Sequence, residues 1–276
     1  MWRYWLLEAV KVALSLLVAL VLAALLSCAG QHVHGFWSWL SALSARLLDM
    51  ISGRFGTSST SGAPAISAVA SVVPVTLELA GMGAVIALAV GLPLGLILSA
   101  SRLLGAAGQI LQTVSATPTF VACLVLLWIA TNTLHASSGY RDLALSLTVV
   151  GMSGAASVQL ALRRAAELAL ERPYRKGLAM MGLSAFEIDM RYVLPEILAG
   201  VFAAFGEIAM ALLTSTAIVE WVYRRKGAAV LFLSSVRAGD WNVAALVLLS
   251  VAAIVIAAAF IGKLAAFIFA PEELDP

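Results

Sequence analysis

The sequence predicts an all-α, polytopic membrane protein with six transmembrane helices. Of its 276 residues, 62% are hydrophobic and only 12% are charged, and the mean hydropathy is +1.00. Soluble domains carry about 25% charged residues. Six apolar runs are long enough to cross the hydrocarbon core, which takes about 20 helical residues. The net charge of +2 is small and the basic residues are dispersed, so nothing indicates a nucleic-acid partner.

The first predicted span covers residues 9–30, within an N-terminal transmembrane unit of residues 1–30. Before it, residues 1–8 carry Arg3 and two tryptophans, which is typical of an anchor at a membrane interface. A cleaved signal is the alternative, because the segment ending at Cys28 resembles a lipoprotein cleavage site. The apolar run is longer than the core of a signal peptide and more spans follow. We therefore expect the helix to stay.

Residues 31–73 form the longest stretch that is not expected to span. Apolar residues recur there at helical spacing and predict an amphipathic helix on the outer surface. These residues are Phe36, Trp37, Leu40, Leu43, Leu47, Leu48 and Ile51. The Gly/Ser-rich residues 56–64 predict a flexible connection. His32 and His34 do not predict a metal site, because no further Cys, Asp or Glu lies close enough to complete a coordination shell.

Three more spans are predicted at residues 74–101, 105–133 with a kink at Pro118, and 143–162. In the second span, Gly91 and Gly95 indicate close helix packing. Glu78 lies in the same span. A charged residue near the bilayer centre costs roughly 2.5 to 3.5 kcal/mol, so Glu78 is expected to face a cavity or an interface. His135, in a short outer loop, is more typical of an interface residue than of a metal ligand.

The polar interval of residues 174–195 interrupts the apolar sequence and must lie outside the hydrocarbon. Gly182 is suited to the left-handed conformation that ends a helix. Ser184 and Glu187 form a capping-box pattern that starts a second helix. Pro195 is expected to limit that second helix. The sequence thus predicts two short helices at an angle, joined by residues 182–184.

Leu178, Met181 and Leu183 would give this pair of helices an apolar face among basic residues. Such a shape suits docking into a groove on another protein. A loop that only connects two spans is the alternative, since capping boxes and basic loops are common.

The fifth span is predicted at residues 196–222. Glu207, Thr214, Ser215 and Thr216 give it a polar content that suits the lining of a translocation path. A packed helix with locally satisfied polar groups accounts for them equally well. A hydrophilic interruption with a partly apolar segment is expected over residues 220–240. The sixth span follows at residues 242–270, and the tail is acidic.

The chain lacks the usual signatures of catalysis. It has no phosphate-binding loop of the G-x-x-x-x-G-K-[ST] type and no nucleophilic triad. Cys28 and Cys123 lie in apolar runs and do not indicate a disulfide framework. We therefore expect no enzymatic activity, no catalytic residue, no metal and no cofactor in this chain.

Six spans place both termini on one side, and the distribution of basic residues weakly favours the cytoplasm for that side. Ten basic residues would lie inside: Arg3, Lys11, Arg102, Arg163, Arg164, Arg172, Arg175, Lys176, Arg191 and Lys263. Seven would lie outside: Arg46, Arg54, Arg141, Arg224, Arg225, Lys226 and Arg237.

Gly182, Leu183 and Ser184, with Leu194 and Pro195, resemble the cytoplasmic signature loop of bacterial ABC-importer permeases. Residues 174–176 and Arg191 resemble more narrowly the dipeptide and oligopeptide branch, which also carries nickel chelates. Residues 75–95 and 117–120 are similar to the family's second and third spans. One departure concerns residues 224–226, three basic residues where the family usually has a proline before the glycine, here Gly227. This departure puts the geometry of the outer gate in doubt.

The resemblance implies a type I ABC-importer permease fold, with a five-helix core over residues 74–270, a coupling loop at 163–195 and a cytoplasmic tail at 271–276. It implies a second homologous permease subunit, two ATPase subunits that bind ATP and Mg, and an external substrate-binding protein in a bacterial inner membrane. The implied ATPase-coupling residues are Tyr174, Arg175, Lys176, Gly177, Leu178, Met181, Gly182, Leu183, Ser184 and Glu187. The candidate residues of the translocation path are Thr76, Glu78, Glu207, Thr214, Ser215 and Glu220.

Two other functions stay open at this point. In an ion-coupled secondary transporter, Glu78 and Glu207 would bind protons or cations near the bilayer midplane. In a membrane scaffold, the two-helix loop would be a docking site only. The substrate, and whether the permease pair is made of like or unlike chains, also stay open.

Overall fold

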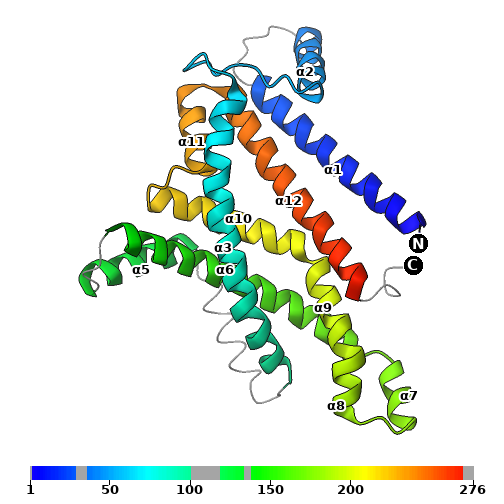
Figure 1. The fold of residues 1–276 in the computed structure, drawn as a ribbon. Coiled ribbons are helices and arrows are strands. Elements are labelled where there is room, and N and C mark those ends of the chain that lie inside the picture. The colour runs from blue at the N-terminus through cyan, green and yellow to red at the C-terminus, as the bar shows by residue number, and fades with distance from the viewer. Residues whose placement is uncertain (1, 29–35, 101–118, 134–137, 270–276) are drawn as a thin grey trace.

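The computed structural model describes residues 2–28, 36–100, 119–133 and 138–269, and its described elements are helices. Figure 1 shows their arrangement. Their bounds are α1 (Trp2–Cys28), α2 (Phe36–Ile51), α3 (Ala65–Ala100), α5 (Thr119–Thr133), α6 (Ser138–Leu170), α7 (Tyr174–Met180), α8 (Ala185–Ile188), the π-helical turn η2 (Asp189–Val193), α9 (Leu194–Ala203), α10 (Phe205–Val222), α11 (Ala228–Ala238) and α12 (Trp241–Phe269).

Five of the described helices are long and apolar enough to cross a membrane: α1, α3, α6, α10 and α12. They confirm the predicted all-α, multi-pass architecture. The third predicted span is represented by α5, and its first part, with the kink at Pro118, lies outside the described residues. His32, His34 and His135 also lie outside them.

Several predicted boundaries were wrong. The second span begins nine residues earlier than predicted, so Pro74 lies inside α3, where Pro93 is also accommodated. Spanning helices tolerate prolines because neighbouring groups satisfy the freed carbonyls. The fourth span, α6, is longer at both ends than the predicted residues 143–162.

The fifth predicted span is divided by a break at Ala204, where the backbone leaves helical geometry (φ −83°, ψ 7°). Here α12 approaches closely. A Cβ added to Gly262 would lie 2.3 Å from the carbonyl oxygen of Phe202, and one on Gly206 would lie 2.7 Å from the Cβ of Ala259. The two glycines allow the helices to meet at the break, as small residues do in membranes.

Pro195 does not end a helix, contrary to the prediction. The chain passes from α8 through η2 into α9, and Pro195 lies in the first turn of α9. A proline there lacks only an N–H that an α-helix leaves unpaired at its start. The π-helical turn shifts the hydrogen-bond register just before it.

The core is built around α3 and α6, which cross in close contact. Buried residues from α3, α6, α9 and α10 form its largest apolar cluster. A Cβ on Gly91 would lie 2.9 Å from the carbonyl oxygen of Ala155, and one on Gly95 would lie 3.2 Å from Leu162. The predicted packing role of both glycines is thereby confirmed.

Residues 56–64 form an ordered loop and not the flexible connection that was predicted. The Ser58 hydroxyl donates to the Asp240 carboxylate, and both residues are buried. The Asn242 side-chain amide donates to the carbonyl oxygen of Thr57 at 2.9 Å. Because α12 begins at Trp241, these bonds tie the loop to the start of α12.

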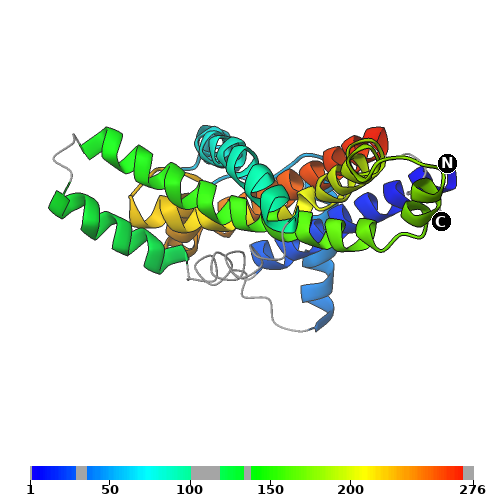
Figure 2. The ribbon, with the colours of Figure 1, turned by 90° about the horizontal axis from the view of Figure 1, so that it is seen from below.

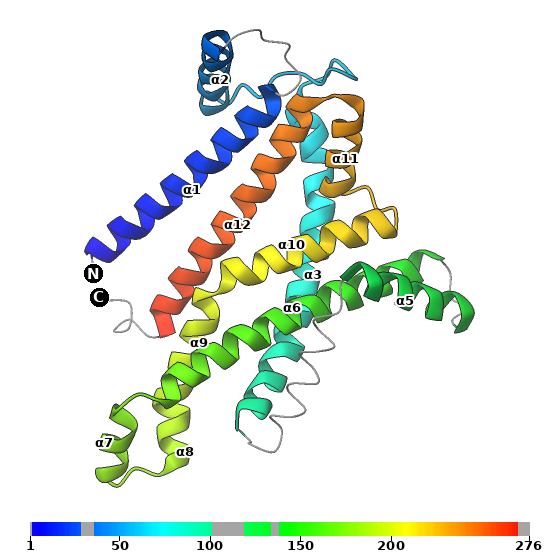
Figure 3. The same cartoon turned by 180° about the vertical axis from the view of Figure 1, so that it is seen from behind.

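In Figures 1 and 3, α2 lies at the top and the α7–α8 pair at the bottom, while the first turns of α1 and the last turns of α12 lie near each other between these levels. Seen from below, α2 projects to one side of the other helices (Figure 2).

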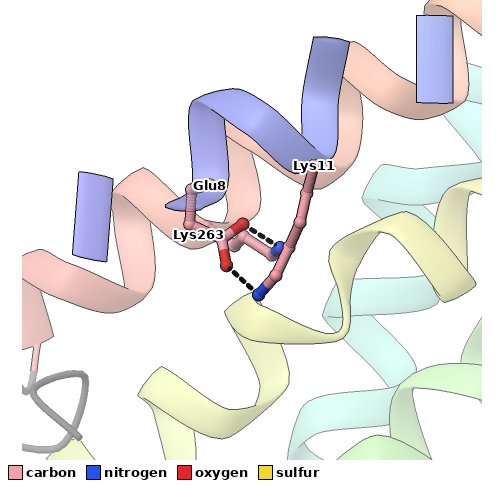
Figure 4. A network of polar contacts seen from close by, with 3 residues as sticks. All are labelled: Glu8, Lys11 and Lys263. Atoms are coloured by element: carbon pink, nitrogen blue, oxygen red, sulfur yellow. Dashed lines mark hydrogen bonds and ion pairs between the residues drawn. The ribbon is translucent and has the colours of Figure 1, made fainter. Parts of the chain in front are cut away.

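An ion network around the buried Glu8 carboxylate joins α1 to α12. The Glu8 carboxylate, about 4% exposed, accepts from Lys11 at 2.7 Å and also contacts Lys263 (Figure 4). Both helices are candidate spans. Polar groups within spans pair with each other because hydrocarbon offers no other partner.

Glu8→Ala is expected to destabilise the protein by about 2 kcal/mol, because it leaves two lysines without their counter-ion. The melting temperature can be followed with a thiol-reactive dye, since Cys28 and Cys123 are both buried and react only on unfolding. Glu167→Ala is the control, because its ion pair with Arg163 is about half exposed on both sides and such pairs contribute little. Equal melting temperatures for the two variants would contradict a stabilising role for the network.

Candidate functional site

The candidate coupling residues form a compact unit made of α7, the turn after it, α8 and η2. Helix α7 ends in a Schellman motif, in which Leu183 N–H donates to the Leu178 carbonyl at 3.3 Å and Gly182 N–H to that of Ala179 at 3.1 Å. This motif needs a left-handed residue, and Gly182 has φ +90°. The predicted helix end at Gly182 is confirmed.

Helix α8 begins where the sequence predicted. Ser184 is its N-cap, and the Ser184 hydroxyl accepts from Glu187 N–H at 3.2 Å. Helices that start with a capped serine gain about 1 kcal/mol relative to alanine. The two short helices joined by residues 182–184 are therefore present as predicted.

Three polar contacts hold the parts of this unit together and connect the unit to α9. Glu196, on α9, accepts from Arg172 Nε at 3.0 Å and from the Tyr174 hydroxyl at 2.6 Å. Arg175 Nη2 lies 2.6 Å from Asp189 Oδ1 and connects α7 to η2. The Glu196 side chain is only about 10% exposed, which strengthens its charged hydrogen bonds. Sequence reasoning missed Glu196 and Arg172 as members of the site.

The exposed apolar face of the unit differs from the predicted one. Leu178 and Leu183 pack against the core cluster. They occupy the two positions whose apolar contact accompanies a Schellman motif. The most exposed large apolar side chains are Met180 (84%), Met181 (77%) and Phe186 (75%), and Met190 and Tyr192 of η2 are exposed to a lesser degree. Of the predicted face, Met181 alone is among them. The sequence spacing would have predicted that Met180 and Phe186 are exposed if the geometry of the turn had been known.

The other predicted coupling residues surround this face. Lys176 and Glu187 are exposed, and Gly177 is partly buried with no atom within 4 Å of an added Cβ. The unit thus presents methionine and phenylalanine side chains among charged ones at the far end of the molecule (Figure 1).

Two of the six candidate path residues are brought together, in the interior. The Thr76 hydroxyl donates to Glu220 Oε1 at 2.6 Å and accepts from Ala228 N–H at 2.8 Å. Glu220 Oε2 accepts from Ala229 N–H at 2.9 Å. Side chains from α3 and α10 thereby satisfy the unpaired N–H groups at the start of α11, where a carboxylate is also favoured by the helix dipole.

Glu220 is fully buried on α10 and does not belong to a hydrophilic interruption, which corrects the sequence prediction. The glycine after the basic residues 224–226 explains how α11 approaches this carboxylate. A Cβ on Gly227 would lie 2.0 Å from Glu220 Cδ. Arg224 has φ +54°, and Arg225 N–H donates to the Glu220 carbonyl at 2.9 Å, so the basic turn closes tightly over the end of α10.

The remaining candidate path residues lie apart from this cluster. Glu78 and Thr214 are exposed, and Ser215 is buried, with its hydroxyl on the Leu212 carbonyl at 2.9 Å. Glu207 is exposed, and its Oε2 lies 3.3 Å from Arg164 Nη1. The structure therefore separates the six into a buried group and an exposed group. Their role in translocation stays a prediction.

The fold and this site define a multi-pass membrane protein with a compact helical unit at one end. Residues 87–273 match a family model described as "Binding-protein-dependent transport system inner membrane component". The match covers about two thirds of the chain and includes the whole α7–α8 unit, so the chain belongs to this family of ABC-type transport permeases. A search of the curated proteins gives no match.

Membership of this family establishes the class of transport protein and the kinds of partner with which its members act. The matched domain is a membrane permease and not an ATPase. Permeases of this family act within ABC importers, together with ATPase and substrate-binding partners. The matched region begins inside α3, so α1 and α2 precede it.

Gly227→Ala is expected to destabilise the chain by roughly 1 to 3 kcal/mol, because the new methyl group displaces the Glu220 carboxylate and leaves buried N–H groups of α11 unpaired. The melting temperature with the thiol dye measures the effect. Gly81→Ala is the matched control, since nothing lies within 4 Å of its added Cβ. A melting temperature for Gly227→Ala as high as that of the control would refute the close contact.

Proposed function

We propose that this chain is one transmembrane permease subunit of an ATP-driven importer for peptides or similar small solutes. It would pair with a second homologous permease and bind two ATPase subunits and an external binding protein. It would lie in a bacterial inner membrane with both termini in the cytoplasm. The observation that carries the proposal is the α7–α8 unit, which is held rigidly and exposes a cluster of large apolar side chains.

That cluster has the character of a docking surface. Met180, Met181 and Phe186 each leave most of their side chain uncovered. Exposed apolar groups rimmed by charge mark interaction sites, and methionine adapts well to a partner groove. Members of this family act with ATPase subunits, and we infer that such a subunit binds the α7–α8 unit.

The unit is also built to transmit force. Arg175 bonds to Asp189 across α7 and η2, and Glu196 connects the unit to α9. A displacement of α8 would therefore move α9 with it. Alternating access requires only that ATP binding favour one packing of the spans over another by a few kcal/mol.

The exposed charged residues of the spans support a water-filled path. Glu78 lies on α3, and Glu207 pairs with Arg164 between α10 and α6. Charges in spans avoid lipid and mark cavities or substrate pathways. The peptide class of the substrate rests on the resemblance of residues 174–176 and Arg191 to the peptide-permease branch.

Gly182→Val is expected to lower substrate-driven transport at least tenfold relative to ATP hydrolysis, because a β-branched residue resists the left-handed conformation that ends α7. Transport and ATPase rates are measured in proteoliposomes with the assembled importer. Gly53→Val is the matched control, since Gly53 also has φ +75° and an open environment but lies after α2. If both variants transport like the parent protein, the proposed role of this turn is wrong.

Phe186→Ser is expected to reduce recovery of the ATPase subunit when the tagged chain is purified in mild detergent, because it removes the aromatic part of the docking surface. Recovery of the second permease should not change. The co-purifying chains are identified by mass spectrometry. Recovery of the unaltered chain alone, in a preparation that still transports, would favour an ion-coupled secondary transporter, and recovery alone without transport would favour a scaffold.

A further inference from the structure

One side of α2 exposes an apolar stripe. Its members are Phe36, Trp37, Leu40, Leu48 and Ile51, and each is at least 40% exposed. With 100° between successive residues, these five side chains fall within an arc of about 120° on the helix. Trp37, at 78% exposed, and Phe36 also form an edge-to-face pair with ring centroids 5.5 Å apart.

The stripe is distinct from the face by which α2 is attached. Leu43 and Met50 are buried against residues of α1 and α12, including Ala24 and Ala245. Going round the helix, this covered face is followed by the exposed stripe and then by polar and small residues such as Ser41 and Ala45. The apolar surface of α2 is therefore wider than the area that the other described residues cover.

The position of α2 indicates what covers the stripe. Helix α1 is a candidate span, and α2 packs on its last turns through Leu25 and Leu26. One and two turns earlier, Leu22 and Val18 are exposed, as expected for a helix surface in lipid. The exposed surface of α2 is thus continuous with the part of α1 that the bilayer must surround.

The direction of α2 also favours lipid as the partner of the stripe. Figures 1 and 2 together show α2 turned strongly away from the axis of α1 at the end opposite the termini. Helix α2 therefore does not continue the path along which α1 would cross the bilayer. Aromatic residues near the end of a span prefer the interface between headgroups and hydrocarbon.

We propose that the exposed stripe of α2 is embedded in the interfacial layer of the bilayer, where lipid is its partner. An amphipathic helix in this position buries its apolar face about 5 to 10 Å below the headgroups. Helix α2 would then hold the end of α1 at a fixed depth. This inference requires that α1 spans the membrane, and it does not depend on the substrate or on the coupling role of α7 and α8.

The test uses nitroxide labels on α2 in the permease reconstituted in lipid nanodiscs. Leu48→Cys and Ile51→Cys place labels on the stripe, and Ala45→Cys is the matched control on the exposed side next to it. Each is made in a Cys28→Ala, Cys123→Ala background, so that the label is unique. Collision rates are measured with oxygen, which concentrates in lipid, and with a water-soluble nickel chelate.

Lipid contact predicts a ratio of oxygen to nickel collisions that is severalfold higher at both stripe positions than at position 45. A ratio equal to that of the control would show that the stripe faces water and would overturn the proposal. Low collision rates with both reagents would show that a protein chain covers the stripe, either a second copy or a partner, and would overturn it as well.

Discussion

The absence of water in hydrocarbon is the constraint on which this structure depends, because each polar group in a span must find its partner inside the protein. Two buried carboxylates show two solutions. Glu8 lies between two lysines and so holds α1 against α12. Glu220 accepts from Thr76 and from the first turn of α11, and so holds α3, α10 and α11 together. In both cases the group that would be costly to bury alone determines which helices lie side by side.

The breaks in the helices separate parts that could move differently. Between α8 and Ala204 the chain is one continuous run of helical geometry, with a π-helical turn that lets it pass Pro195. That run carries the α7–α8 unit at one end and packs against α6 and α12. Beyond Ala204, α10 also packs against α6 and α12, and it adds contacts with α3, α5 and α11. A displacement of α8 would pass directly to α9. Ala204 is the first position after α8 at which the helical geometry is interrupted, and α12 packs closely against the chain there.

The sequence correctly predicted the features that depend on residues close to each other in the chain. The all-α class, the amphipathic α2, the turn at Gly182 and the cap at Ser184 follow from periodicity and from single residues, and each is confirmed. The predictions were wrong for features that depend on contacts with distant parts of the chain. The place of Pro195 inside a helical run depends on the hydrogen-bond register of η2, and the burial of Glu220 depends on α11, which begins after it. The ordered path of residues 56–64 depends on Asp240, which is 182 positions from Ser58. The predicted coupling face was wrong at two of its three residues, since Leu178 and Leu183 pack against the core cluster at the Schellman motif that ends α7.

The segment that precedes the family-matched region holds α12 at both of its ends. Lys263, near one end, bonds to Glu8 of α1, while Asp240 and Asn242, at the other, bond to Ser58 and Thr57 of the loop after α2. Apolar contacts of α1 and α2 with α12 lie between these points. Helices fixed to each other at two separated places cannot rotate or slide independently. A rearrangement of the core that leaves these bonds intact would therefore move α1 and α12 together, relative to the other helices that pack on α12, which are α3, α9, α10 and α11.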